Sequence, residues 1–129
     1  MAKRFSGTEK WGKEWFQQLS PKHKCLWQYL CDTCDHAGVW EPNFSLASFQ
    51  IGAKITSQDI DALNGRVVGL PSGKFFVVDF IDFQYGKLSQ DCKAHVPAFK
   101  SLEKNGITQE MIRVWKGYPK GIDTLMDID

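Results

Sequence analysis

The segment from Ser45 to Tyr85 places the strongest constraint on how this chain can fold. Its first half holds two short apolar runs separated by Gly52, a residue that readily adopts the positive φ that ends a helix. Thr56, with Asp59 three positions later, matches a capping box, which is a signal that a second helix begins. An Asn-Gly pair then interrupts the pattern, so this helix is predicted over residues 57–64. The sequence thus predicts two helices joined by a tight turn.

The second half of the segment has the composition of a β-hairpin. Residues 66–70 form a short strand-like run, Pro-Ser-Gly-Lys at 71–74 is a turn sequence, and residues 75–83 are aromatic and β-branched. We therefore predict strand, turn and strand, with Asp79 and Asp82 on the solvent side of the second strand and at its exit. Two helices followed by a hairpin is the order of a winged helix, in which one helix commonly occupies a DNA groove.

The flanking sequence predicts an α+β fold that is mainly helical. Residues 21–35 are apolar around most of the helical girth and predict a central buried helix. Val39-Trp40-Glu41 resembles a short strand that can pair with the hairpin. Residues 95–104 predict a further helix, which Asn105-Gly106 ends. The fold class is therefore a winged helix, a helix-turn-helix plus a β-hairpin wing, with extra C-terminal helices.

These patterns divide the chain into four parts. Residues 1–10 are polar and basic and are expected to form a flexible arm, and residues 11–106 are expected to form the winged-helix domain. Residues 107–117 predict an amphipathic C-terminal helix. Residues 118–129 combine Pro, Gly and three Asp, which predicts a disordered acidic tail.

Composition points to a cytoplasmic protein. No apolar run approaches the roughly 18 residues that a membrane span needs, and residues 1–10 lack the apolar centre of a signal peptide. The four cysteines are then expected to be thiols or metal ligands rather than disulfides. The formal charge of +1 is low for a nucleic-acid module, and residues 56–86 carry two basic against four acidic residues. Any positive face must therefore come largely from the flanking segments.

Polar and basic side chains near the predicted second helix and hairpin are the candidates for DNA contact. Side chains at the start of a recognition helix reach base edges, whereas cations on a wing or an arm hold phosphates. The candidate DNA-binding residues are Lys54, Ser57, Gln58, Asn64, Arg66, Lys74, Lys3 and Arg4. Asp59 and Asp61 oppose this assignment because they repel phosphates, although acids in a first turn also serve the helix dipole. An ordinary solvated helix face stays an alternative interpretation.

One group of residues has the spacing of zinc ligands. Cys31 and Cys34 form one pair, and Cys92 and His95 form another. Because the first pair lies in an apolar predicted helix rather than in a knuckle turn, buried thiols are the favoured interpretation, and no cofactor is expected. The chain contains no GxxxxGK[ST], GxGxxG or HExxH motif, and its three histidines lie in different segments. The sequence therefore predicts a protein that is not an enzyme.

Several motifs resemble the N-terminal module of phage and prophage replisome organisers, which are similar to primosomal DnaD-type proteins. They are WFQQLSPKHK at 15–24, DHAGVW at 35–40, LASF at 46–49, and FQYGKL at 83–88 with His95. The resemblance covers about residues 14–106. It implies a winged helix that binds origin DNA or self-associates, with partners that load the replicative helicase.

These observations together predict a phage-type protein that binds double-stranded DNA during replication initiation. Its partners would be duplex DNA and a replicative helicase or helicase loader, with self-association as a further expectation. Two alternatives remain open: a winged helix that serves as a protein-interaction or oligomerisation module, and a transcription regulator of the same fold.

Overall fold

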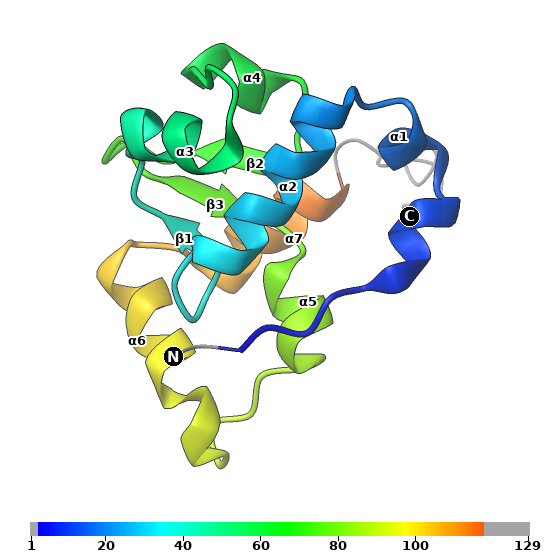
Figure 1. Cartoon of the computed structure of the whole chain (residues 1–129). Helices are drawn as coiled ribbons and strands as arrows, with labels where there is room; N and C mark the ends of the chain where they lie inside the picture. Colours follow the sequence, from blue (N-terminus) through cyan, green and yellow to red (C-terminus); the bar gives the residue numbers. More distant parts are fainter. Residues whose placement is uncertain (1–2, 118–129) are drawn as a thin grey trace.

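The computed structural model describes residues 3–117, and the structural statements below refer to that part of the chain. Figure 1 shows a small central sheet with helices packed around it. The helices are α1 (Glu14–Gln17), α2 (Pro21–Thr33), α3 (Phe44–Ile51), α4 (Ser57–Asp61), α5 (Phe80–Tyr85), α6 (Val96–Lys104) and α7 (Gln109–Gly117). The short 3-10 segments are η1 (Thr8–Gly12) and η2 (Lys93–His95), and the strands are β1 (Val39–Trp40), β2 (Val67–Gly69) and β3 (Phe75–Val77). The fold is thus α+β and mainly helical, as predicted.

The sheet has the antiparallel order β1-β3-β2, with Val39 opposite Phe76 and Trp40 opposite Phe75. Because successive strand residues point to opposite faces, Phe75 and Val77 meet one set of helices while Phe76 meets the other. Residues of α2, α3, α4 and α5 form a core on the first face. Residues of α6 and α7 form a second core on the other face (Figure 1). The sheet is therefore the middle of three layers.

The predicted helix boundaries in the first half of the chain are largely confirmed. The Ser20 side chain caps α2 by accepting a hydrogen bond from the His23 N–H. Gly52 ends α3 in the left-handed conformation, with a φ of 89°. The capping box of Thr56 and Asp59 is present at the start of α4. However, α4 ends at Asp61 rather than at residue 64, and the chain continues in successive tight turns.

The expectation of a long second hairpin strand over residues 75–83 is wrong. β3 ends at Val77, and the chain then turns into α5, with Asp79 at the N-cap position and Asp82 in the first turn. Phe80 and Phe83 lie one helical turn apart and pack against the same core. Both acids lie at the positive end of the helix dipole, which favours negative charge there. Asp79 and Asp82 therefore belong to a helix start and not to a solvated strand.

Residues 1–10 were expected to form a flexible arm, and in the structure residues 3–10 lie against the body of the protein. The Arg4 guanidinium donates to the Cys34 carbonyl at 2.7 Å and lies over the Phe80 ring, 5.5 Å from its centroid. The Phe5 N–H donates to the Gln84 side chain at 2.9 Å. At the other end, α7 confirms the helix expected over 107–117. The acidic tail expected at 118–129 lies outside the described residues.

Candidate nucleic-acid interface

The N-terminal end of α4 presents a polar, exposed surface. Ser57 and Gln58 are both exposed on its first turn, and Lys54 is exposed in the turn that joins α3 to α4. Since α4 contains only five residues, its first turn supplies most of the side chains that it presents to solvent. Three of the predicted contact residues are thus brought together on one surface.

Asp59 is turned away from this surface and fastens α4 to the start of α2. Its side chain is 14% exposed, and its carboxylate accepts hydrogen bonds from the Thr56 N–H at 2.8 Å and from the His23 ring at 2.9 Å. The Lys22 ammonium lies 3.1 Å from the same carboxylate. Burial raises the pKa of Asp59, but the bonds from His23, Thr56 and Lys22 outweigh it and hold that pKa well below its usual value. The charge expected to repel phosphates is therefore partnered within the protein.

Two further polar residues, Asp61 and Asn64, lie at the end of α4 and just after it. Asn64 is exposed and has a φ of 53°, so it occupies the left-handed turn that follows α4. Asp61 is exposed on α4 and remains a negative charge close to the candidate surface. The surface around α4 is therefore polar but only weakly basic.

Arg66 lies away from this surface, contrary to expectation. Its guanidinium stacks on the Trp15 ring at 4.0 Å from the ring centroid and lines a cleft that also contains Asp79. Burial lowers the pKa of Arg66, while the nearby Asp79 carboxylate opposes that change. Trp15 is far from Arg66 in the sequence, so no local pattern around Arg66 predicts this contact.

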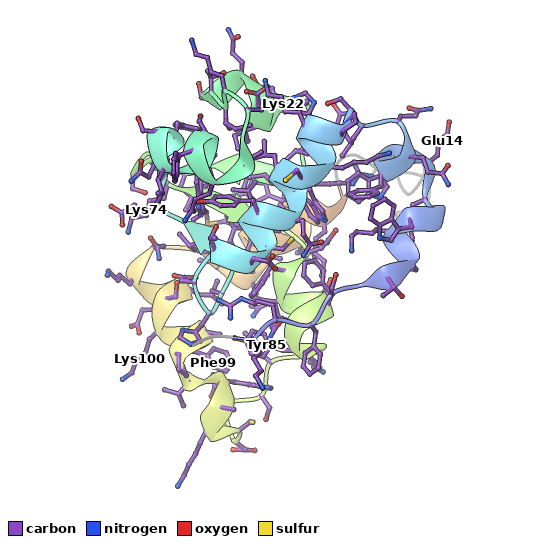
Figure 2. All side chains as sticks on the ribbon, in the orientation of Figure 1. Glu14, Lys22, Lys74, Tyr85, Phe99 and Lys100 are labelled. Atoms are coloured by element: carbon purple, nitrogen blue, oxygen red, sulfur yellow. The ribbon has the colours of Figure 1, made fainter. Side chains whose placement is uncertain are left out.

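Lys74 lies at the hairpin turn but packs toward α3. It is half-buried beside a hollow of about 420 Å³ that Leu46 and Gln50 of α3 also line. Figure 2 shows Lys74 on the side of α3, whereas Lys22 lies near α4. The exposed turn residues Ser72 and Gly73 precede it. The hairpin therefore presents one cation at a distance from the first turn of α4.

The two cations expected to hold phosphates from the N-terminal arm, Lys3 and Arg4, lie in different environments. Lys3 is exposed, but Arg4 is held by the Cys34 carbonyl and the Phe80 ring described above. Arg4 is thus a structural residue that fastens the N-terminal segment, and it is not free to clamp phosphates.

The zinc interpretation of the Cys and His residues is not supported by their positions. Within residues 3–117, no group of three or more Cys, His, Asp or Glu side chains is arranged to hold a metal ion. Cys31 and Cys34 are buried, the Cys34 thiol donates to the Cys31 carbonyl, and burial raises the pKa of Cys34 to about 12. The His95 ring instead accepts a hydrogen bond from the Ser89 N–H at 2.9 Å.

Two surface features were not predicted as sites from the sequence. Leu46 and Phe49 of α3 are 45% and 84% exposed, while Ala47 on the same helix is fully buried. The second feature is the cleft beside Arg66, which the N-terminal segment covers. The sequence of α3 did indicate exposed apolar side chains, because this helix has more apolar residues than one buried stripe can hold.

Comparison with protein-family models, with curated protein sequences and with solved structures gave no match. Within residues 3–117, none of the helices has the length and apolar character needed to cross a bilayer. Function is therefore argued from the geometry and chemistry of this chain.

Proposed function

We propose that this chain is a non-enzymatic winged-helix protein that binds duplex DNA in replication initiation, in the manner of the replisome organisers that it resembles. The order α2, β1, α3, α4, β2, β3 and the sheet order β1-β3-β2 support this proposal, because helices followed by an antiparallel hairpin are expected of a winged helix. The single observation that carries the proposal is the first turn of α4, which is polar, exposed and preceded by a lysine. A helix start of this kind suits entry into the major groove.

In this proposal, the first turn of α4 contacts the bases and the lysines contact the phosphates. Gln58 has the amide group that pairs with adenine in the major groove, and Ser57 accepts or donates to either kind of base edge. Lys54 and Lys74 contact the DNA backbone on either side. The bonds of Asp59 to α2 fix the orientation of α4 before DNA arrives, so that little ordering is required on binding.

The small number of available cations predicts weak salt dependence. Arg4 and Arg66 are engaged inside the protein and Lys3 lies on the N-terminal segment, which leaves Lys54 and Lys74 as the main phosphate contacts beside α4. Two phosphate contacts give a slope of log K against log salt of about −2. Affinity for DNA of arbitrary sequence is therefore expected to be low, and base contacts carry most of the discrimination.

Fluorescence anisotropy with a labelled duplex at several salt concentrations tests this interface. Lys54→Ala and Lys74→Ala should each weaken binding and reduce the magnitude of the salt slope by about 1. Gln58→Ala should weaken binding without changing the slope. The matched control is Lys100→Ala on α6, which Figure 2 places away from α4. An unchanged slope in both lysine variants, or an equal loss in the control, would remove this surface from the DNA interface.

A second candidate function is self-association through α3, which the exposed side chains of Leu46 and Phe49 favour. Two exposed apolar residues one helical turn apart suit a symmetric contact in which the same surface of two copies meets. Sedimentation in high salt should then detect a dimer that Phe49→Ser disrupts and Val114→Ser, at an exposed apolar position on α7, leaves intact. A monomer at all concentrations would exclude this function.

A further inference from the structure

The cleft beneath the N-terminal segment is separate from the α4 surface. Residues 5–13 run along one side of the protein and leave a hollow of about 610 Å³ between themselves, α2 and α5. Its lining combines aromatic, basic and acidic side chains, among them Phe5, Trp15, Lys10, Lys13, Glu9 and Asp79. A hollow of this size is in the range that holds a bound small molecule. In Figure 1 the N-terminal segment and α1 lie on the side opposite α3 and the hairpin.

Aromatic side chains are unusually exposed around this cleft. Phe5, at its edge, is 71% exposed, and Trp11 of η1, on the same segment, is 59% exposed. Trp15 and Phe83 line the cleft itself, and one Trp15 face is already covered by the Arg66 guanidinium. Exposed aromatic rings on a protein surface are platforms on which unpaired bases stack. Duplex bases cannot use such rings, because they are stacked inside the helix.

Two lysines of the cleft are available to a ligand, whereas two of its three acids lie beside cations. In the part of the chain that the structure describes, the Lys10 ammonium donates to the Ser6 hydroxyl at 2.9 Å and the Gly7 carbonyl at 3.1 Å, and it lies about 6 Å from the Trp11 and Phe16 ring centroids, all uncharged groups. Among residues 3–117, no carboxylate forms an ion pair with Lys10 or Lys13. Asp82 is paired with Lys116 of α7 at 2.5 Å, and Asp79 lies beside Arg66. Glu9 is the third acid of the lining and has no ion pair within residues 3–117, so Lys10 and Lys13 leave the cleft with only a small excess of positive charge.

We propose that this cleft and the exposed aromatics beside it bind single-stranded DNA, with Phe5 and Trp11 stacking on bases and Lys10 and Lys13 holding phosphates. Lysines beside exposed aromatic rings are the elements that sequence-tolerant single-strand binding generally uses. The site goes beyond duplex recognition by α4 and does not depend on it. A protein with both surfaces holds a duplex on one side and a separated strand on another.

The test uses the whole chain, a labelled oligo-dT, an abasic phosphodiester of the same length, and a labelled duplex. Oligo-dT should bind in a salt-sensitive manner and quench tryptophan fluorescence, and the abasic chain should bind more weakly. The Phe5→Ala/Trp11→Ala double variant should lose about tenfold or more in affinity for oligo-dT, since each stacked base contributes substantially. Its affinity for duplex should not change, and circular dichroism should show an intact fold because both rings are exposed.

Two double variants test whether binding of oligo-dT depends on lysine charge, and whether it depends on the lysines of the cleft in particular. Lys10→Ala/Lys13→Ala should weaken oligo-dT binding and reduce its salt slope, whereas Lys93→Ala/Lys100→Ala, at exposed positions outside the cleft, should not. Lys54→Ala should affect duplex binding alone, so that failure of either site is recognised independently of the other. The proposal is overturned if oligo-dT does not bind at low salt, if the aromatic variant binds it normally, or if both lysine pairs have equal effects.

Discussion

At the residue scale, the role of Asp59 becomes clear only in the structure, because its sequence context allows two opposite roles. In the sequence it is either an acid that repels phosphates or a helix cap. In the structure it caps α4, accepts from His23 and lies beside Lys22, so its charge stabilises the junction of α4 and α2. The orientation of the proposed recognition helix therefore depends on one carboxylate that does not face the DNA.

Asp59→Ala should lower the free energy of unfolding at neutral pH by about 1–2 kcal/mol, the usual cost of losing a helix cap. Because the folded pKa lies below the ordinary value of 3.8, this contribution is complete above about pH 4 and is lost as the pH falls through the folded pKa. Urea unfolding at several pH values should show the wild-type advantage shrinking below pH 4. Asp61→Ala, at an exposed position on the same helix, is the control and should change stability little.

Arg4 and Arg66 show what could not be predicted from single residues. Both are strong candidates for phosphate contact by residue type, yet both guanidiniums lie over aromatic rings that are distant in the sequence. Arginine stacks on rings as readily as it binds phosphates, and sequence position does not distinguish the two. By contrast, the polar first turn of α4 was predicted correctly, because caps and turns are local signals.

At the scale of single elements, the run at 75–83 was misassigned for a definable reason. A short apolar run does not reveal whether it forms a strand or a buried helix, because both bury every position. Here a strand and a helix share the run, and only Asp79 marks the boundary between them. The spacing of Phe80 and Phe83 was the available helical signal, since a strand would place them on opposite faces.

The turn between α2 and β1 places a strict requirement on Gly38. Its φ is 105°, and a Cβ at this position would lie 2.7 Å from the Phe80 Cβ and 3.1 Å from the Val77 carbonyl oxygen. Gly38→Ala should therefore destabilise the protein by about 2 kcal/mol or more, because it combines backbone strain with a clash against a buried helix. Thermal unfolding followed by circular dichroism measures the loss.

Gly73→Ala at the hairpin turn is the matched comparison for this prediction. Its φ is 92°, but a Cβ there would meet no atom of residues 3–117 within 4 Å. It should carry only the cost of backbone strain, which is about 1 kcal/mol. Equal losses in the two variants would contradict the proposed close contact between Gly38 and α5.

At the scale of the whole molecule, the sequence predicted the arrangement of the chain better than its surface. The helix order, the short first strand and the antiparallel hairpin follow from caps, turns and periodicity, and all are present. The closure of residues 3–12 over α5 was not predicted, because it depends on contacts such as Phe5 with Gln84 across the chain. The cleft between them exists only as a result of that closure.

The two proposed DNA surfaces lie on the side of the first core, whereas α6 and α7 form the second core on the other face of the sheet. The α4 surface and the N-terminal cleft both adjoin the core that α2 dominates. The second core, built on Phe76 and Val78, supports the sheet from behind. Substitutions in that second core should therefore affect stability more than either kind of DNA binding.

The pairing of β1 with β3 also has a consequence for how the protein acquires its structure. These short strands join Trp40 to Phe75, and the whole of α3 and α4 lies in the loop that this pairing closes. Loop closure costs entropy before any contact compensates for it, and α4 is too short to persist as an isolated helix. We therefore expect the helix proposed to enter the DNA groove to become stable only together with the pairing of the central strand.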